Sequence, residues 1–250
     1  MGAFFYPGWV LALDCPTSQF DETARVKSVH DGDTLKLTDG RKIRLIGINT
    51  PELARDGKSA QAFALEARDF LKQLIQSAKN NIQLVYGIER KDKYKRTLAH
   101  LYLPDGNNIQ ALLIREGLAT AFTTPPNDRL SSCYRALENT AIQQKKGIWS
   151  LADYQPIATT ALTRNHRGFR RITGLVVSTH KSDNSFWIKL EGSLAIRIKQ
   201  HNLKYFKLEK LNELKGKTII TRGWIHPEKS GHFMNLSHPD AFSLIPPTVH

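Results

Sequence analysis

The sequence predicts a mainly β protein with helices, of the α+β class. Short runs rich in β-branched and apolar residues, separated by Asp-Gly pairs, fill residues 25–53. The spacing of apolar residues then changes to three and four over 59–79, as in an amphipathic helix. A second strand-like stretch occupies 169–247. We therefore expect two β-rich regions, with the main helices in the first.

The first region is predicted to run from strands through a helix to further strands and helices. RVKSV, DTLKLTDG and RKIRLIGI supply the opening strands, and SAQAFALEARDFLKQLIQSAK (59–79) supplies the first helix. Strands return at 81–89 and 96–106. Two more helices are predicted at 108–117 and 128–147, because each segment is apolar on one face and stops at a glycine.

The second region is strand-like throughout. Residues 151–168 have no clear period and contain Pro156 and a polar TRNHRG run, so we expect a linker there. DTLKLTDGRKIRLIGI and SFWIKLEGSLAIRIKQ share the order strand, acidic-Gly turn, strand, which an internal duplication or any two hairpins would produce. The expected organisation is an N-terminal segment at 1–24, a first domain at 25–150, a linker at 151–168 and a second domain at 169–247.

Charge points to a polyanionic partner. The 250 residues carry a formal net charge of +13 and an isoelectric point near 9.8. Counting Lys and Arg against Asp and Glu, residues 1–162 have 21 and 17 (+4), whereas 163–250 have 15 and 6 (+9). Such an excess favours nucleic acid ahead of an acidic membrane surface.

The N-terminus and the cysteines bear on localisation. MGAFFYPGWVLALDC is apolar between Ala3 and Leu13, but it lacks a basic n-region and Pro7 interrupts it. Either a signal-peptide remnant or a segment that packs on the domain would look like this. No stretch of the sequence approaches the roughly 18 apolar residues of a membrane span. Cys15 and Cys133 suit one disulfide in an exported protein or two thiols in a cytosolic one.

Three polar motifs flank the strands of the first region. DGDT (31–34), taken alone, is typical of a turn. RLIGINTPE (44–52) places Arg44 at one end of an apolar run and Glu52 just beyond the other. KDKYKR places Arg96 directly before a strand.

These residue types suit phosphodiester hydrolysis. Arginine is always charged and its planar fork can hold two phosphoryl oxygens, so Arg44 and Arg96 could grip a phosphate from two sides. Glu52 is then the candidate general base that deprotonates water. The simpler alternative for Arg44 and Glu52 is a surface ion pair that flanks a strand.

A hard cation would complete such a site. Calcium takes oxygen ligands at about 2.3–2.6 Å. Asp33 and the backbone carbonyl of Thr50 could supply them, with Asp31 and Asn49 nearby, and the cation would act as a Lewis acid on a phosphate oxygen.

In this order, the motifs resemble the staphylococcal nuclease (thermonuclease-like) family. The match runs from about Val26 to Ser150 and includes DGDT, Arg-x7-Glu, DKY-x-R, REGLA at 115–119 and the closing IWS. The resemblance implies an OB-fold, a five-stranded β-barrel with three helices. It also implies cleavage of DNA and RNA to 5′-hydroxyl and 3′-phosphate products. The implied roles are phosphate binding by Arg44 and Arg96, general base catalysis by Glu52, and calcium binding by Asp33 and Thr50.

Two positions depart from the family pattern. Familiar members carry an aspartate ligand where this chain has Asn49; an amide oxygen still coordinates, so we expect Asn49 to bind calcium more weakly. The family's best-known member stacks tyrosines on the base in the segment that corresponds to 117–128, whereas here only Phe122 is aromatic. Lys93 and Tyr94, beside the phosphate-binding arginine, are further candidate substrate contacts; a half-buried strand aromatic is the alternative for Tyr94.

The family fold would place Cys15 before the first strand and Cys133 on the last helix of the domain. A disulfide between them would close a loop of over a hundred residues and stabilise the fold by about 4 kcal/mol. We therefore expect a periplasmic or secreted protein, with the cytoplasm as the alternative if the thiols are free.

The second region looks like another OB barrel. It lacks counterparts of Arg44, Glu52 and Arg96, so a non-catalytic nucleic-acid-binding role is expected, by base stacking and phosphate neutralisation. The alternative for each aromatic residue is a place in the core. The aromatic residues are Phe169, Phe186, Trp187, Tyr205, Phe206, Trp224, Phe233 and Phe242.

The predicted function is a calcium-dependent, sugar-non-specific endonuclease that acts on DNA and RNA, with other divalent cations as alternatives and no protein partner indicated. The main rival is a non-catalytic nucleic-acid-binding protein built on nuclease-like barrels, which would explain Asn49 and the missing tyrosines. Against it stands the joint presence of Arg44, Glu52 and Arg96. A third reading is a structural module that binds membrane or protein through its basic face.

Overall fold

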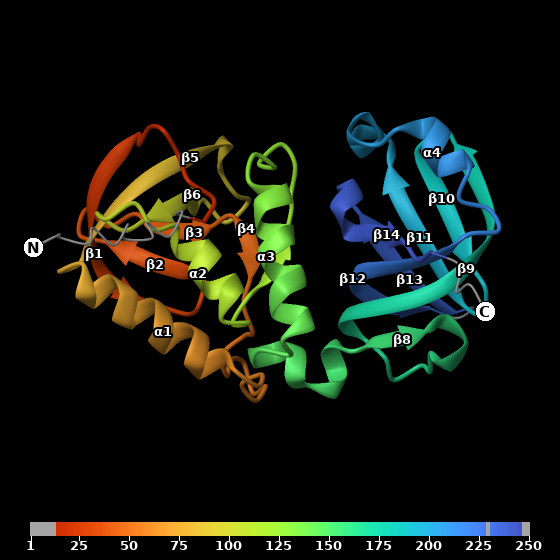
Figure 1. Cartoon of the computed structure of the whole chain (residues 1–250), viewed down its shortest axis with the longest axis horizontal. Helices are drawn as coiled ribbons and strands as arrows, with labels where there is room; N and C mark the ends of the chain where they lie inside the picture. Colours follow the sequence, from red (N-terminus) through yellow and green to blue (C-terminus); the bar gives the residue numbers. More distant parts are fainter. Residues whose placement is uncertain (1–13, 229–230, 247–250) are drawn as a thin grey trace, which may run out of the picture.

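The computed structural model describes residues 14–228 and 231–246, and Figure 1 shows two β-barrels side by side with helix α3 between them. The apolar segment that could be a signal remnant or a packing segment lies, over residues 1–13, outside this description. No helix in the described part of the chain has both the length and the apolar character to cross a membrane.

The first barrel closes in the order β1-β2-β3-β6-β5. All neighbours are antiparallel except β3 and β6, which run parallel. Apolar side chains alternate into the barrel, as Leu35, Leu37, Ile43 and Leu45 do, and all four are buried. The strands are β1 (Glu22–Val29), β2 (Thr34–Leu37), β3 (Lys42–Leu45), β5 (Asn81–Lys91) and β6 (Thr97–Tyr102).

The run 41–48, expected as one strand, is two strands. The chain leaves the barrel after β3 and forms a separate two-stranded sheet, in which β4 (Gly47–Asn49) pairs with β7 (Thr120–Phe122). Gly47 permits the change of direction, because its φ is +82° and a Cβ there would lie 2.6 Å from the ring of Tyr134.

Three helices cover the first barrel. Helix α1 buries Ala64, Ala67, Leu71 and Ile75, which are three or four residues apart, against the barrel core. Helix α2 begins at the Asn108 cap, whose Oδ1 accepts from the backbone N–H of Ala111. Each helix is shorter at its ends than expected: α1 (Ala64–Ser77), α2 (Ile109–Arg115) and α3 (Ser131–Gln143).

The second barrel repeats the topology of the first. Its strands close in the order β9-β10-β11-β13-β12, with only β11 and β13 parallel. Two OB-like barrels, as predicted, are therefore confirmed. The strands are β9 (Gly168–Ser182), β10 (Ser185–Leu190), β11 (Leu194–Lys199), β12 (Thr218–Glu228) and β13 (Gly231–Leu236).

Short elements complete this half of the chain. The segment 151–168, expected as a linker, contains β8 (Pro156–Ala158), which pairs in parallel with β9. Strand β14 (Phe242–Leu244) pairs with β12. The remaining elements are α4 (Leu208–Asn212) and the 3₁₀ turns η1 (Gly147–Ser150), η2 (Ala152–Tyr154), η3 (Thr159–Ala161), η4 (Gln200–Tyr205) and η5 (Pro239–Ala241).

The barrels are joined through a buried ion pair. Arg222 on β12 pairs with Glu138 on α3 and donates to the carbonyl of Ala121 on β7. The side chains of Arg222 and Glu138 are only 6% and 0% exposed. Beside them, the rings of Phe122 and Trp224 meet edge to face at 4.9 Å. Because an unpaired buried charge is costly, this pair favours a single arrangement of the barrels.

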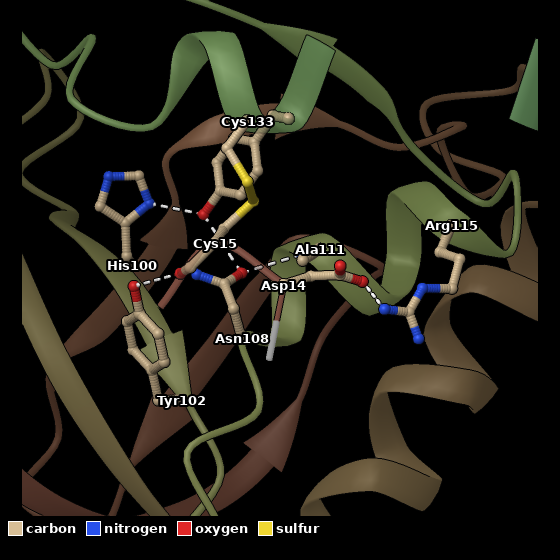
Figure 2. The surroundings of a disulfide bond; sticks show 9 residues. Asp14, Cys15, His100, Tyr102, Asn108, Ala111, Arg115 and Cys133 are labelled. Carbon is tan, nitrogen blue, oxygen red and sulfur yellow. Dashed lines mark hydrogen bonds and ion pairs between the residues drawn. A yellow bond between two sulfur atoms is a disulfide. The ribbon is translucent and has the colours of Figure 1, made fainter. Parts of the chain in front are cut away.

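A disulfide joins Cys15 to Cys133 across 118 residues, and Figure 2 shows its polar surroundings. The hydroxyl of Tyr102 donates to the carbonyl of Cys15 at 3.1 Å. Nδ1 of His100 lies 2.8 Å from the hydroxyl of Tyr134. Burial lowers the pKa of His100 to about 3, so this histidine is neutral in the folded protein.

Candidate active site

One cavity of about 640 Å³ in the first barrel brings the three polar motifs together. Pairing of β2 with β3 sets Thr34 opposite Arg44, and parallel pairing of β3 with β6 brings the segment around Arg96 alongside. Most of the predicted site residues therefore line one cavity. Those that line the cavity are Asp33, Arg44, Asn49, Glu52, Tyr94 and Arg96, together with Asp31.

Asp33 is held in the floor of the site. Its carboxylate accepts from the hydroxyl of Thr34 at 3.1 Å and from the backbone N–H of Thr50 at 3.2 Å. Burial raises the pKa of the Asp33 carboxyl, while the Arg44 guanidinium opposes that shift. The preceding Gly32 is required by space, because a Cβ there would lie 2.8 Å from the side chains of Ala67 and Thr50.

Arg44 is oriented by acceptors on several sides. Its Nη2 lies 2.9 Å from Oδ2 of Asp33 and donates to the carbonyl of Ile48 at 3.0 Å. Its Nη1 donates to the carbonyl of Leu45. A guanidinium fixed in this way needs little reorganisation to meet an anion in the cavity.

Asn49 lies between Arg44 and Thr50. Its Nδ2 donates to the carbonyl of Thr50 at 3.2 Å, and its Oδ1 lies 3.4 Å from Nη2 of Arg44. The amide group therefore contacts the same carbonyl that the sequence offers as a calcium ligand.

The donor set fits a hard cation. Two carboxylates, of Asp31 and Asp33, and the oxygens of Asn49 and Thr50 lie in one neighbourhood, and calcium prefers such ligands. No group of three or more His, Cys, Asp or Glu side chains suited to a metal occurs within 14–228 and 231–246.

Glu52 and Arg96 both line the cavity and come from different segments of the chain. Glu52 is exposed, and its backbone forms a reciprocal pair with Gln61, each bond 2.9 Å long. Nε of Arg96 donates to Oδ2 of Asp92 at 2.7 Å, and its Nη1 lies 3.4 Å from the Thr34 hydroxyl. Although burial acts in the opposite direction, the hydrogen bonds from Arg96 hold the pKa of Asp92 below its ordinary value.

The other predicted substrate contacts line a neighbouring cavity of about 590 Å³. Tyr94 is 67% exposed and stands 5.5 Å from the Arg96 guanidinium, so it is not a half-buried strand aromatic. Lys93 lies over the same ring. Phe122 closes the far wall, where it also packs on Trp224 of the second barrel.

Several basic residues of the main cavity were missed by the sequence reasoning. Lys36 and Lys42 are a cross-strand pair on β2 and β3, and His30 and Arg55 lie in flanking segments. The alternation of the hairpin places Lys36 and Lys42 on the same outward face, so correct strand register would have found that pair.

Comparisons with known proteins agree with this site. The family model described as staphylococcal nuclease homologue matches residues 42–151. A thermonuclease of Staphylococcus intermedius is 36% identical over 131 residues, which are 51% of this chain and 76% of the relative. An uncharacterized endonuclease of Escherichia coli O157:H7 is 34% identical over 155 residues, 61% of this chain and 93% of the relative. Endonuclease YncB of Bacillus subtilis is 35% identical over 128 residues, which are 50% of this chain and 60% of the relative.

Proposed function

The chain belongs to the family of staphylococcal nuclease homologues and is a phosphodiester-hydrolysing nuclease, and we propose that it is a calcium-dependent endonuclease for both DNA and RNA. The observation that carries the proposal is the convergence of Arg44, Glu52 and Arg96 on one cavity, with Asp33 at its floor. The thermonuclease and endonuclease relatives support the reaction class.

The proposed chemistry assigns three roles to four side chains. Arg44 and Arg96 bind non-bridging oxygens of the scissile phosphate and offset the negative charge that grows in the transition state. Glu52 accepts a proton from the attacking water, for which its exposed carboxylate is available. Asp33 positions Arg44, since their ion pair fixes the guanidinium at the cavity wall.

Calcium would be held by the oxygens of Asp33, Asn49 and Thr50, with Asp31 close by. When bound, the cation supplies Lewis-acid stabilisation of a phosphoryl oxygen. Asn49 lowers the negative charge of this ligand set relative to an aspartate, which favours weaker binding.

The substrate range follows from what the arginines recognise. Contacts to backbone phosphates carry no sequence information and do not distinguish the two sugars, so cleavage should be general. The family resemblance adds 5′-hydroxyl and 3′-phosphate products. The disulfide supports a periplasmic or secreted location, because reducing compartments disfavour such bonds.

One observation favours the rival reading of a non-catalytic nucleic-acid-binding protein. The carbonyl of Thr50 accepts from the amide of Asn49, so one of the two lone pairs of this oxygen is already engaged and less of its charge is available to a metal. Metal dependence therefore decides between the two functions.

Digestion of plasmid and single-stranded DNA, with calcium, with magnesium and with a chelator, tests the proposal. Wild-type protein should cleave in calcium and stop in the chelator. Glu52→Ala should abolish cleavage, while Glu66→Ala, at an exposed position on α1, should not. Cleavage that is unchanged by Glu52→Ala, or absent under every metal, would overturn it.

A further inference from the structure

The active-site cavity is the first of four cavities, each of which shares wall residues with the next. It shares Arg44, Tyr94 and Arg96 with the neighbouring cavity of about 590 Å³. That cavity shares Phe122 with a third, of about 320 Å³, which lies between the barrels. Shared wall residues mean that the cavities are neighbours, so a strand laid over the surface would meet each of them in turn.

The third cavity leads onto the second barrel. Its walls come from β7 on one side and from β11, β12 and β13 on the other. It shares Lys199 and His201 with a fourth cavity of about 540 Å³, which also includes Arg197. Trp224 lines this third cavity, and its ring meets Phe122 edge to face at 4.9 Å and Phe169 at 5.4 Å.

Beyond Lys199, the outer face of the second barrel carries a cluster of Trp187, Arg197 and Phe233. Trp187 lies opposite Arg197 in the β10–β11 pairing, and Phe233 lies opposite Ala195 on the other side of β11. The guanidinium carbon of Arg197 is 5.7 Å from the Trp187 ring and 4.9 Å from the Phe233 ring. Nε of Arg197 donates to Oδ1 of Asn235 at 3.1 Å, which holds the guanidinium over the two rings, whose centroids are 6.1 Å apart.

These rings are not the core of the barrel. The core side chains of the same strands, such as Ile188, Ile196 and Met234, point inward and are buried. Trp187 and Phe233 occupy the alternate positions and remain partly exposed. The sequence alone does not show which of the eight aromatic residues of this region lie in the core and which lie on the surface. In the structure Phe186, for example, is buried in the core.

At the second-barrel end of this path, the positive charge is not neutralised by ion pairs within the described residues. In the described ranges, no acidic side chain forms a salt bridge with Arg197 or Lys199, and the fourth cavity has no acidic residue in its wall. Residues 163–250 carry 15 basic and 6 acidic side chains, an excess of nine. A surface that carries both aromatic rings and unpaired cations suits a ligand that has both flat apolar groups and negative charges.

Resting on the nuclease function proposed above, we propose that the second barrel binds single-stranded nucleic acid. The strand lies on the Trp187–Arg197–Phe233 face and passes Trp224 and Phe122 into the active site. Single strands fit this path because their bases are free to stack on side chains, whereas the bases of a duplex are stacked on one another. The consequence is a preference for long single strands over short ones and over duplex.

The test compares kcat/KM on a single strand of about 25 nucleotides, on a trinucleotide and on a duplex of the long sequence. Wild-type protein should prefer the long single strand. In the double variant Trp187→Ala, Phe233→Ala, the ratio of kcat/KM for the long strand to that for the trinucleotide should fall about 10-fold or more, since each stacked base contributes about 1–3 kcal/mol. Leu175→Ala with Val177→Ala, exposed positions on β9, is the matched control and should leave the ratio unchanged.

A second variant guards against misfolding. Arg197→Gln keeps the packing size but removes the charge, and it should reduce the salt dependence of long-strand binding by about one ion. The proposal would be overturned if the double variant kept the wild-type ratio of kcat/KM for the long strand to that for the trinucleotide and Arg197→Gln kept the wild-type salt dependence of binding. It would also be overturned if the double variant lost kcat/KM equally on duplex and on single strand.

A binding measurement distinguishes failure of the proposed nuclease function from failure of the proposed single-strand binding surface. Binding of a fluorescent single strand of about 25 nucleotides to Glu52→Gln, followed by anisotropy, needs no cleavage. If wild-type protein cleaves nothing but this binding weakens about 10-fold in Trp187→Ala with Phe233→Ala, only the nuclease mechanism fails. An acidic peptide of equal charge that competes as well as the oligonucleotide would instead overturn the single-strand assignment.

Discussion

Nη2 of Arg44 lies 2.9 Å from Oδ2 of Asp33, and the two side chains are only 15% and 9% exposed. Neither group can be altered without affecting the other, because a half-buried arginine and a buried carboxylate neutralise one another. The pair connects the DGDT turn to β3, so it links the fold of the barrel directly to the site that binds phosphate.

Arg44→Ala should reduce the single-turnover cleavage rate by about 10²–10³-fold, the usual cost of losing one preorganised donor to a developing charge. It should also lower the free energy of unfolding, because Asp33 is left buried without its cation. Arg68→Ala on α1 is the control, since within the described residues that arginine forms an ion pair with its neighbour Asp69 alone. A rate within a few-fold of wild type would remove Arg44 from the phosphate site.

Asn49→Asp should tighten calcium binding about 10-fold, because a carboxylate adds charge to the ligand set. It also removes the amide donor that contacts the Thr50 carbonyl. Isothermal titration with calcium measures the change, and Asn81→Asp adds the same charge at an exposed position as control. Equal affinities for wild type and Asn49→Asp would mean that residue 49 does not contact the metal.

Replacing both cysteines (Cys15→Ser with Cys133→Ser) should lower the free energy of unfolding by about 4–5 kcal/mol. The bond closes a loop across 118 residues, and its loss restores conformational entropy to the unfolded chain. Urea denaturation of the variant, and of reduced wild-type protein, should agree. A loss below about 1 kcal/mol in both would show that the helix α3 end is held by packing instead.

The protein should lose stability as the pH falls below 6.5. The pKa of His100 is lowered to about 3 in the fold, so the unfolded chain binds a proton between these values and the folded chain does not. Tyr134 shares its hydrogen bond, and Arg129 adds a smaller repulsion. From pH 7 to pH 5 this histidine alone should cost roughly 2 kcal/mol.

Urea denaturation at the two pH values measures that loss. His100→Gln should flatten the dependence, whereas His226→Gln, at an exposed position on β12, should keep it. An identical slope in wild type and His100→Gln would show that the histidine is not the group responsible.

Local patterns in the sequence predicted the elements and the content of the site. The alternation of Leu35 and Leu37 gave a strand, the spacing of Ala67 and Leu71 gave a helix, and both are buried as expected. Three motifs that are distant in sequence meet in one cavity because hairpin pairing and the OB topology bring their strands together.

Long-range pairings were not predictable from those patterns. Arg222 and Glu138 are 84 residues apart, and in a strongly basic chain a buried arginine has the same local signal as a solvent-exposed one. The same holds for Trp224, whose contact with Phe122 depends on how the barrels pack. The break at Gly47 needed the position of Tyr134, which no local pattern contains.

Single-turnover cleavage and DNA binding by Glu52→Gln, in calcium and beside wild-type protein, test the central claim most directly. The variant should bind DNA with nearly unchanged affinity but cleave at least about 10²-fold more slowly, because it has lost only the general base. Cleavage by Glu52→Gln at the wild-type rate would contradict the assignment of this cavity as the active site.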